Sequence, residues 1–253
     1  MRVAVISDLH SNREALEAVF ARIGTLDVSS VFCLGDVIGY GPDPEFCVDL
    51  VRERADVALM GNHDEALFRD ASDFNTHARG AIDYTRRRMK PNWFSGREKK
   101  ARWRWLQDLA ISHDEGRFHF VHGSPRDPVR EYVLSTDGFL NPDKLIGIFD
   151  CFDGVAVGGH THHPGMHDQS LSFHGLDGKE SCRMEIPQEG KYIINVGSVG
   201  QPRDGDSRAC FAVIEENSVT WHRVRYDIAA TQRKIRETGE LSEILAKRLT
   251  LGK

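Results

Sequence analysis

The sequence predicts a layered α/β domain, and three features of the 253-residue chain indicate it. Short apolar runs rich in β-branched residues recur and are followed by Gly, Asp or Asn, which is typical of buried strands. In the first third, segments with helical spacing separate these runs. No internal repeat, low-complexity tract or linker divides the chain. We therefore expect a single domain over residues 1–253, with a helical insertion at about residues 65–110.

The first third of the chain alternates between strand-like and helix-like segments. An apolar run at residues 3–6 precedes a helical pattern at residues 12–23. A second run at residues 31–34 leads to a predicted helix over residues 44–54, and a third run follows at residues 57–60. A strand, a helix and a strand in succession imply a parallel pair with a right-handed crossover.

The predicted insertion, from Glu65 to about Leu109, is mainly helical with a break at Pro91-Asn92. It contains Trp93, Trp103 and Trp105 and a cluster of basic residues: Arg86, Arg87, Arg88, Lys90, Arg97, Lys99, Lys100, Arg102 and Arg104. Two interpretations of this cluster are open. It is a solvated helical face with aromatic side chains packed beneath it, or a helical cap that guides a polyanionic substrate.

The second half of the chain is richer in strands. Strands are expected at residues 171–174, 192–196, 209–215 and 219–224. The last two flank Glu216-Asn217, a short polar turn typical of a hairpin. Helices are predicted within residues 135–149 and from Asp227 onward.

Composition excludes several classes of protein. Acidic residues outnumber basic ones by 38 to 33, and the net charge of −5 argues against a dedicated nucleic-acid binder, so we expect no stable nucleic-acid partner. No apolar stretch approaches the length that spans a bilayer, and the N-terminus opens on a strand-like run. We expect a cytoplasmic protein without a membrane partner. The five cysteines are widely spaced without a CxxC pair and are expected to be structural thiols.

Side chains that ligate metals follow the apolar runs. The motifs are Asp8-Leu9-His10, Gly35-Asp36, Gly61-Asn62-His63-Asp64, His122 and Gly159-His160-Thr161-His162. Because ligands bind beyond the carboxyl ends of parallel strands, these residues are expected to converge. Carboxylates, an Asn carbonyl and imidazoles without thiolates suit Mn, Fe, Zn, Co or Ni. They are too many for one ion, and a pair of ions needs a shared ligand. Asp36 is the natural candidate, because its strand is expected beside that of Asp8.

In this order the motifs resemble those of the calcineurin-like metallophosphoesterases. The resemblance extends from Asp8 to His162, and the turn Asn195-Val196-Gly197-Ser198 is also similar. It implies a four-layer α/β/β/α sandwich of two mixed sheets. The protein phosphatases of the family carry GDxVDRG, whereas the segment from Gly35 to Gly41 lacks that Asp-Arg pair. The segment therefore also differs from the larger diadenosine tetraphosphatases that share this motif. Residues 197–205 and the chain length are more similar to the small bacterial and archaeal phosphoesterases, of a diadenosine tetraphosphatase-like or phosphodiesterase-like kind.

The resemblance also implies an activity and its cofactors. The expected enzyme is a metal-dependent phosphoric ester hydrolase with two divalent or transition metal ions (Mn, Fe, Zn, Ni or Co). It would hydrolyse a phosphodiester, phosphomonoester or dinucleoside polyphosphate bond of a phosphorylated small molecule or nucleotide, by in-line attack of a hydroxide that bridges the metals. The alternative is a catalytically weak metal-binding scaffold or regulatory protein of the same fold. Such members lose ligands, and this chain retains all those expected.

Roles for single residues follow from the matched motifs. One metal would be held by Asp8, His10, Asp36 and His162, and the other by Asp36, Asn62, His122 and His160. His63 would be the general acid for the leaving group or an electrostatic partner of the phosphoryl group. Asp64 would orient His63, or cap a helix that starts at Glu65.

Three further residues are candidates for substrate binding. Arg203 and Arg126 lie in Gly- and Pro-containing turns, and a guanidinium can form paired hydrogen bonds to phosphate. Both are equally consistent with surface arginines. Asn75, at the start of the insertion, is the third candidate.

Overall fold

The computed structural model describes residues 2–176 and 178–253. Within them the first sheet contains β1 (Arg2–Ile6), β2 (Ser30–Cys33), β3 (Val57–Ala58), β9 (Ser181–Glu185), β11 (Ala209–Glu215) and β12 (Ser218–Val224). The second sheet contains β4 (Ser112–Glu115), β5 (Phe118–Val121), β6 (Val155–Gly158), β7 (Gly165–Asp168), β8 (Phe173–Gly175) and β10 (Tyr192–Asn195). The strand orders are β3-β2-β1-β11-β12-β9 and β4-β5-β6-β10-β7-β8. Both sheets mix parallel and antiparallel pairs.

Nine helices are found in the same residues. They are α1 (Arg13–Ile23), α2 (Pro44–Arg54), α3 (Asn62–Ala66), α4 (Thr76–Met89), α5 (Arg97–Gln107), α6 (Asp137–Leu140), α7 (Pro142–Phe149), α8 (Ile228–Glu237) and α9 (Glu243–Leu251). None of them is long and apolar enough to cross a bilayer.

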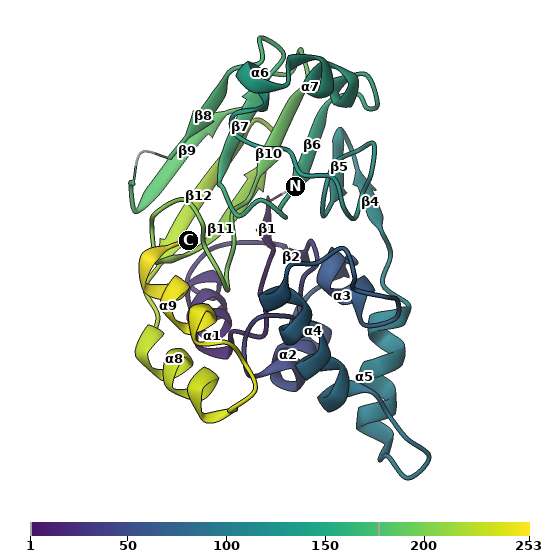
Figure 1. The fold of residues 1–253 in the computed structure, drawn as a ribbon. Coiled ribbons are helices and arrows are strands. Elements are labelled where there is room, and N and C mark those ends of the chain that lie inside the picture. Colours follow the sequence, from purple (N-terminus) through teal and green to yellow (C-terminus); the bar gives the residue numbers. More distant parts are fainter. Residues whose placement is uncertain (1, 177) are drawn as a thin grey trace.

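The side chains of β1 show how the layers form, because alternate residues of a strand face opposite sides of the sheet. Val3 and Val5 pack in the core between the two sheets, whereas Ala4 and Ile6 pack in the core that includes α1, α2 and Leu106 of α5. On the other side of the molecule α7 covers β6 and β10. Figure 1 shows the two sheets between these groups of helices. The predicted α/β/β/α sandwich of two mixed sheets is confirmed.

The direction of the strands positions the functional loops. β1, β2 and β3 are parallel neighbours in the first sheet, and β5 and β6 are parallel neighbours in the second. Each of the five predicted ligand motifs follows the carboxyl end of one of these strands. The register pairs Ile6 of β1 with Cys33 of β2, which confirms that the strands preceding Asp8 and Asp36 are adjacent.

Several elements differ from the sequence prediction. The strands β4, β7 and β9 were not predicted, and the helix expected within residues 135–149 is divided into α6 and α7 at Asn141-Pro142. Proline lacks an amide hydrogen and its ring hinders the preceding residue from a helical conformation, so a new helix starts there. The hairpin at Glu216-Asn217 is confirmed. All five cysteines are free thiols.

Trp221 connects the two sheets. Its side chain is fully buried on β12, and its indole Nε1 donates a 2.8 Å hydrogen bond to the carbonyl of Asn195 on β10. Trp221→Ala should lower the free energy of unfolding by about 3 to 5 kcal/mol, because it leaves a cavity and an unpaired carbonyl. Trp221→Phe should lower it by less, because most of the ring remains. Chemical denaturation measures both, with the exposed Phe139→Ala as a control. Equal, small losses for all three variants would contradict this role.

Candidate metal centre

The loops that carry the predicted ligands adopt an unusual backbone conformation. Positive φ angles occur at Asp8 (56°), His10 (48°), Asp36 (51°), His160 (65°) and His162 (61°). Residues other than glycine rarely adopt this conformation, which costs of order 1 to 3 kcal/mol each and is concentrated at functional sites. Five of the seven predicted metal ligands thus lie on strained backbone.

Two of these loops approach each other so closely that only glycine fits. A Cβ atom on Gly61 would lie 2.1 Å from Oδ1 of Asp36, and one on Gly35, where φ is +100°, would lie 2.4 Å from the amide nitrogen of Gly61. The backbones after β2 and β3 are therefore in direct contact, and this contact fixes the position of the Asp36 carboxylate.

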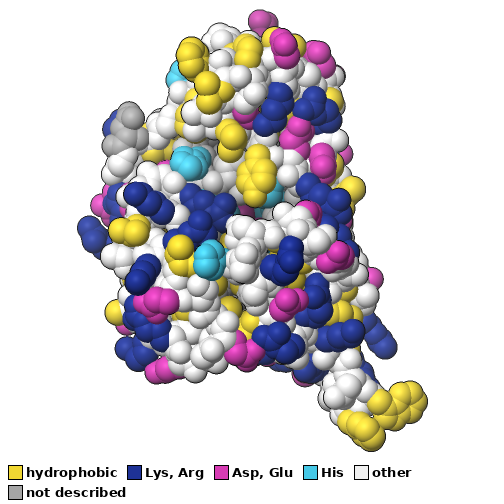
Figure 2. All heavy atoms as spheres, in the orientation of Figure 1, with side chains coloured by type: hydrophobic (Ala, Val, Ile, Leu, Met, Phe, Trp, Pro, Cys, Tyr) yellow, Lys and Arg dark blue, Asp and Glu magenta, His cyan; other side chains and the backbone are white. Residues whose placement is uncertain are grey.

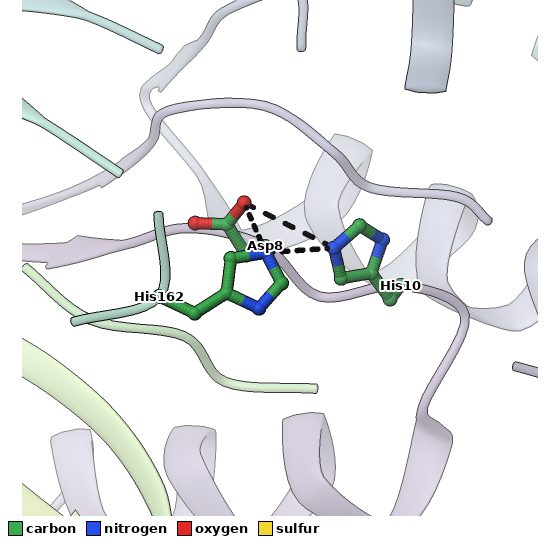
Figure 3. A group of neighbouring side chains, drawn as sticks. All are labelled: Asp8, His10 and His162. Carbon is green, nitrogen blue, oxygen red and sulfur yellow. Dashed lines mark hydrogen bonds and ion pairs between the residues drawn. The ribbon is translucent and has the colours of Figure 1, made fainter. Parts of the chain in front are cut away.

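One group of potential ligands consists of Asp8, His10 and His162, all buried (Figure 3). Nε2 of His10 lies 3.2 Å from Nε2 of His162. Asp8 Oδ1 lies 3.2 Å from His162 Nε2 and 3.9 Å from His10 Nε2. Its other oxygen, Oδ2, accepts a 3.0 Å hydrogen bond from the amide of His160, which fixes the carboxylate.

A second group consists of Asp36, His122 and His160, with Asn62 beside them. Nε2 of His122 lies 3.1 Å from Nδ1 of His160 and 3.2 Å from Oδ1 of Asn62. Asp36 joins the two groups, because its Oδ2 lies 3.6 Å from Nε2 of His122 and 3.6 Å from Nε2 of His10. The structure thus brings together all seven predicted metal ligands.

Hydrogen bonds to backbone carbonyls determine which nitrogen of each histidine faces this space. Four contacts do so: His122 Nδ1 with Leu34 O at 2.9 Å, His160 Nε2 with Arg130 O at 3.0 Å, His10 Nδ1 with Ile38 O at 3.3 Å, and His162 Nδ1 with Gln201 O. A carbonyl oxygen only accepts, so these nitrogens donate, and in a neutral ring the opposite nitrogen carries a lone pair.

The rings are uncharged at neutral pH, because burial lowers the pKa of all four imidazoles. In the pairs His10–His162 and His122–His160, two unprotonated ring nitrogens therefore face each other, 3.2 and 3.1 Å apart, with no proton between them. Asp8 Oδ1 is likewise buried without a hydrogen-bond donor among the described residues. Burial, followed by the nearby Asp64 and Asp8, raises the pKa of Asp36 well above its ordinary value. Bound cations satisfy all of these groups, so the donor set fits metal ions.

His63 lies beside the ligands but differs from them. One of its ring nitrogens is within reach of His10 and Asp36, yet Nδ1 has no hydrogen-bond partner in the described part of the chain. Its backbone amide donates a 2.8 Å hydrogen bond to Asp36 Oδ1. Burial, followed by the charge of Arg203, lowers the pKa of His63 well below its ordinary value. The ring is therefore neutral at pH 7 and has one N–H to donate.

Asp64 supports the loops rather than the imidazole of His63. Its carboxylate accepts hydrogen bonds from the amides of Gly61 (3.0 Å), Ile38 (3.2 Å) and Val37 (3.3 Å). Burial raises its pKa to about 7. The helix α3 starts at Asn62 rather than at Glu65, so Asp64 lies in its first turn and caps it.

The predicted substrate-binding residues lie in different places. Arg203 lies beside the site, where Nη2 donates to the Tyr40 hydroxyl at 3.4 Å and to Gln201 Oε1 at 3.0 Å, but it is not among the residues that line the pocket above His63 and His160. Asn75 caps α4 and lines a pocket above His63 and His160. Arg126 is not among the lining residues of this pocket and is paired with Glu131.

Sequence reasoning missed seven of the residues that line this pocket: Tyr40, Arg69, Asp73, Phe74, Ala78, Arg130 and Tyr132. Tyr40 packs against the rings of His63 and His10 at centroid distances of 4.5 and 4.6 Å. Tyr132 stacks on His160 with the ring centroids 3.8 Å apart, and Arg130 lines the same pocket. Tyr40 follows Asp36 within the same turn, so its position after a ligand is a usable signal. Arg130 and Tyr132 lie in a long loop without periodicity, and no local pattern indicates them.

The basic cluster of the insertion does not reach this pocket. None of its nine residues lines it in the described structure, and the cations that do are Arg69 and Arg130. Arg86, for example, donates to carbonyls at the end of α3, and Arg102 pairs with Asp49. The geometry therefore gives no support to the cluster as a guide for substrate.

Comparison with known proteins identifies the family. Residues 1–218 match the model of the calcineurin-like phosphoesterase superfamily domain. The chain is 34% identical over 260 residues to an uncharacterized protein of Methanocaldococcus jannaschii, an alignment that covers 99% of this chain and 98% of the relative. The crystal structure of a metallophosphoesterase from Sphaerobacter thermophilus is 37% identical, with a TM-score of 0.84 and full coverage of both chains.

A hypothetical protein from Pyrococcus horikoshii shares the fold at 17% identity, with a TM-score of 0.76 over 100% of this chain and 98% of that one. The family model covers most of the chain, and the buried clusters of Asp and His residues are those of a metal-binding site. This chain belongs to the calcineurin-like phosphoesterase superfamily.

Proposed function

We propose that this protein is a dinuclear metal-dependent phosphoesterase that hydrolyses a phosphodiester, phosphomonoester or dinucleoside polyphosphate bond. The observation that carries the proposal is the position of Asp36, whose Oδ2 lies 3.6 Å from a lone-pair nitrogen in each of two ligand groups. A carboxylate shared in this way is the usual bridge between two metals.

The two metal positions would use the ligands as grouped above. Asp8, His10 and His162 would hold one ion, Asn62, His122 and His160 the other, and Asp36 both. When bound, such ions activate a water molecule and neutralise phosphate oxygens. Mn, Fe, Zn, Ni and Co all suit this donor set.

The remaining site residues would act on the substrate. His63 is neutral and would donate its N–H to the leaving oxygen, while Arg203 would bind the non-bridging phosphate oxygens. Asp64 would act by holding the backbone around Gly61 and Ile38. One face of the Tyr132 ring is stacked on His160, and its other face, together with Arg130, would contact the rest of a phosphorylated small molecule or nucleotide.

Asp36→Asn should reduce metal content and activity together. Loss of a hydrogen-bond partner of a metal ligand typically costs about 10- to 100-fold in affinity or activity, so loss of the bridging charge should cost at least as much. Elemental analysis and hydrolysis of bis(p-nitrophenyl) phosphate with added Mn²⁺ measure the two effects. Asp168→Asn is the control, because this carboxylate forms hydrogen bonds with Ser170 and His174 outside the site. It should change neither the metal content nor the activity. Two bound metals with full activity in Asp36→Asn would refute the bridge.

His63→Ala should lower kcat by about 10²- to 10⁴-fold, the usual contribution of a residue that transfers or donates a proton. Its metal content should stay at the wild-type level, because neither of the two proposed ligand sets includes its ring. His167→Ala is the matched control, since His167 is also buried but lies outside the centre. Wild-type turnover of an aryl phosphodiester by His63→Ala would exclude this role.

Arg203→Lys should raise KM and lower kcat/KM by about 10- to 100-fold, because paired hydrogen bonds to a charged group contribute about 1.5 to 3 kcal/mol. Arg126→Lys should leave both constants unchanged, since Arg126 is paired with Glu131 away from the pocket. Steady-state kinetics on the same diester compares them. Equal effects of the two substitutions would remove Arg203 from the substrate site.

A panel of phosphodiesters, phosphomonoesters and dinucleoside polyphosphates separates the proposed substrates. It also tests the alternative of a catalytically weak scaffold. A protein that contains both metals but hydrolyses no member of the panel would support the scaffold and contradict the enzyme.

A further inference from the structure

The loop between α4 and α5 ends in two aromatic side chains that contact little of their own chain. Trp93 is 87% exposed and Phe94 is 92% exposed, whereas Trp103 and Trp105 pack against the core. Figure 1 shows this loop projecting from the body, and Figure 2 shows apolar side chains at its end. Two adjacent exposed aromatics of this size are typical of a binding surface. We call Trp93 and Phe94 the aromatic tip.

A hollow lined by seven apolar and three charged residues lies at the other end of α5. It is lined by Val51, Arg52, Ala55, Asp56, Val57, Ala58, Trp105, Asp108, Leu109 and Ala110. Ile111, which follows the last of these residues, is 50% exposed. We call this region the α5 hollow. The aromatic tip precedes the first turn of α5 and the hollow includes its last turn, so the two features are separated by one helix about 16 Å long.

The charges around the two features are opposite. Lys90, Arg97 and Lys99 flank the aromatic tip and form no ion pair within residues 2–176 and 178–253. Asp56 and Asp108 of the hollow have no cationic partner in the same residues, and Arg52 is paired with Asp49 and with Glu98 of the first turn of α5. A positively charged projection and a hollow with two carboxylates that lack a cationic partner are complementary in charge.

We infer that the aromatic tip binds the α5 hollow of a second copy, so that two chains form a two-fold dimer across α5. A two-fold axis near the middle of the helix exchanges its ends, and each tip then enters the hollow of the other chain. Such an interface is self-complementary and closed, because each copy contributes the same two features.

The two tips supply much of the area that a specific dimer needs. Trp and Phe bury about 150 to 250 Å² each, so four of them contribute about 600 to 1,000 Å². This is half or more of the area of about 1,200 Å² at which specific interfaces begin. An anionic membrane would cover the tip but would leave the hollow and its two carboxylates unexplained. A second copy accounts for both.

The mass of the full chain in solution tests the inference. Sedimentation velocity of the wild-type protein at micromolar concentration should give twice the chain mass of 28.5 kDa. The variant Trp93→Ala/Phe94→Ala should sediment as a monomer, and so should Ala110→Arg, which places a charged side chain in the hollow. Phe139→Ala/Leu140→Ala is the matched control and should remain dimeric, because it removes equally exposed apolar groups from α6. Unchanged thermal unfolding of the monomers shows that they are folded.

Three results would overturn the inference. The first is a monomeric wild-type protein, and the second is a tip variant that still dimerises. The third is a monomer that binds vesicles containing phosphatidylserine only when Trp93 and Phe94 are present, which would assign the tip to a membrane instead.

Discussion

The architecture of the centre depends on four imidazole rings whose outer nitrogens are bound to backbone carbonyls. This constraint leaves four lone pairs, together with the carboxylates of Asp8 and Asp36, directed at one buried space. Burial keeps the rings neutral, so their inner nitrogens present lone pairs rather than protons to that space. Such a set of donors favours positive charge, and hydrogen bonds to the backbone orient the rings for it.

The two sheets provide the rigidity that this arrangement requires. Strained φ angles at residues such as Asp8 and Asp36 cost of order 1 to 3 kcal/mol each, and such conformations persist only where the surroundings enforce them. Here the enforcement comes from paired parallel strands and from the contact between Gly61 and Asp36. Trp221 connects the sheets that carry the two sets of loops, so the packing of the core and the geometry of the centre are coupled.

Much of the fold could be predicted because its signals are local. The helix from Pro44 to Arg54 and the strand from Ala209 to Glu215 have the predicted limits, and polar motifs after parallel strands indicated where ligands would meet. The strand β4, with the sequence Ser-His-Asp-Glu, gave no such signal, because it is a polar edge strand defined by its pairing with β5.

The remaining differences arise from contacts that no local pattern encodes. Tyr132 reaches the pocket through a long irregular loop, and only tertiary packing places its ring on His160. One of the two interpretations of the basic cluster placed the aromatic side chains beneath it. Trp103 does pack against the core, but Trp93 lies at the end of a projecting loop. An aromatic residue that contacts a partner and one that fills a core look alike in a single sequence.

Anomalous diffraction from crystals of the metal-loaded protein would show how many ions the centre binds and which residues ligate them. Two peaks about 3.5 to 4 Å apart are expected, with Asp36 ligating both. One peak would be ligated by Asp8, His10 and His162, and the other by Asn62, His122 and His160. A single peak, or two peaks of which only one contacts Asp36, would contradict the shared ligand.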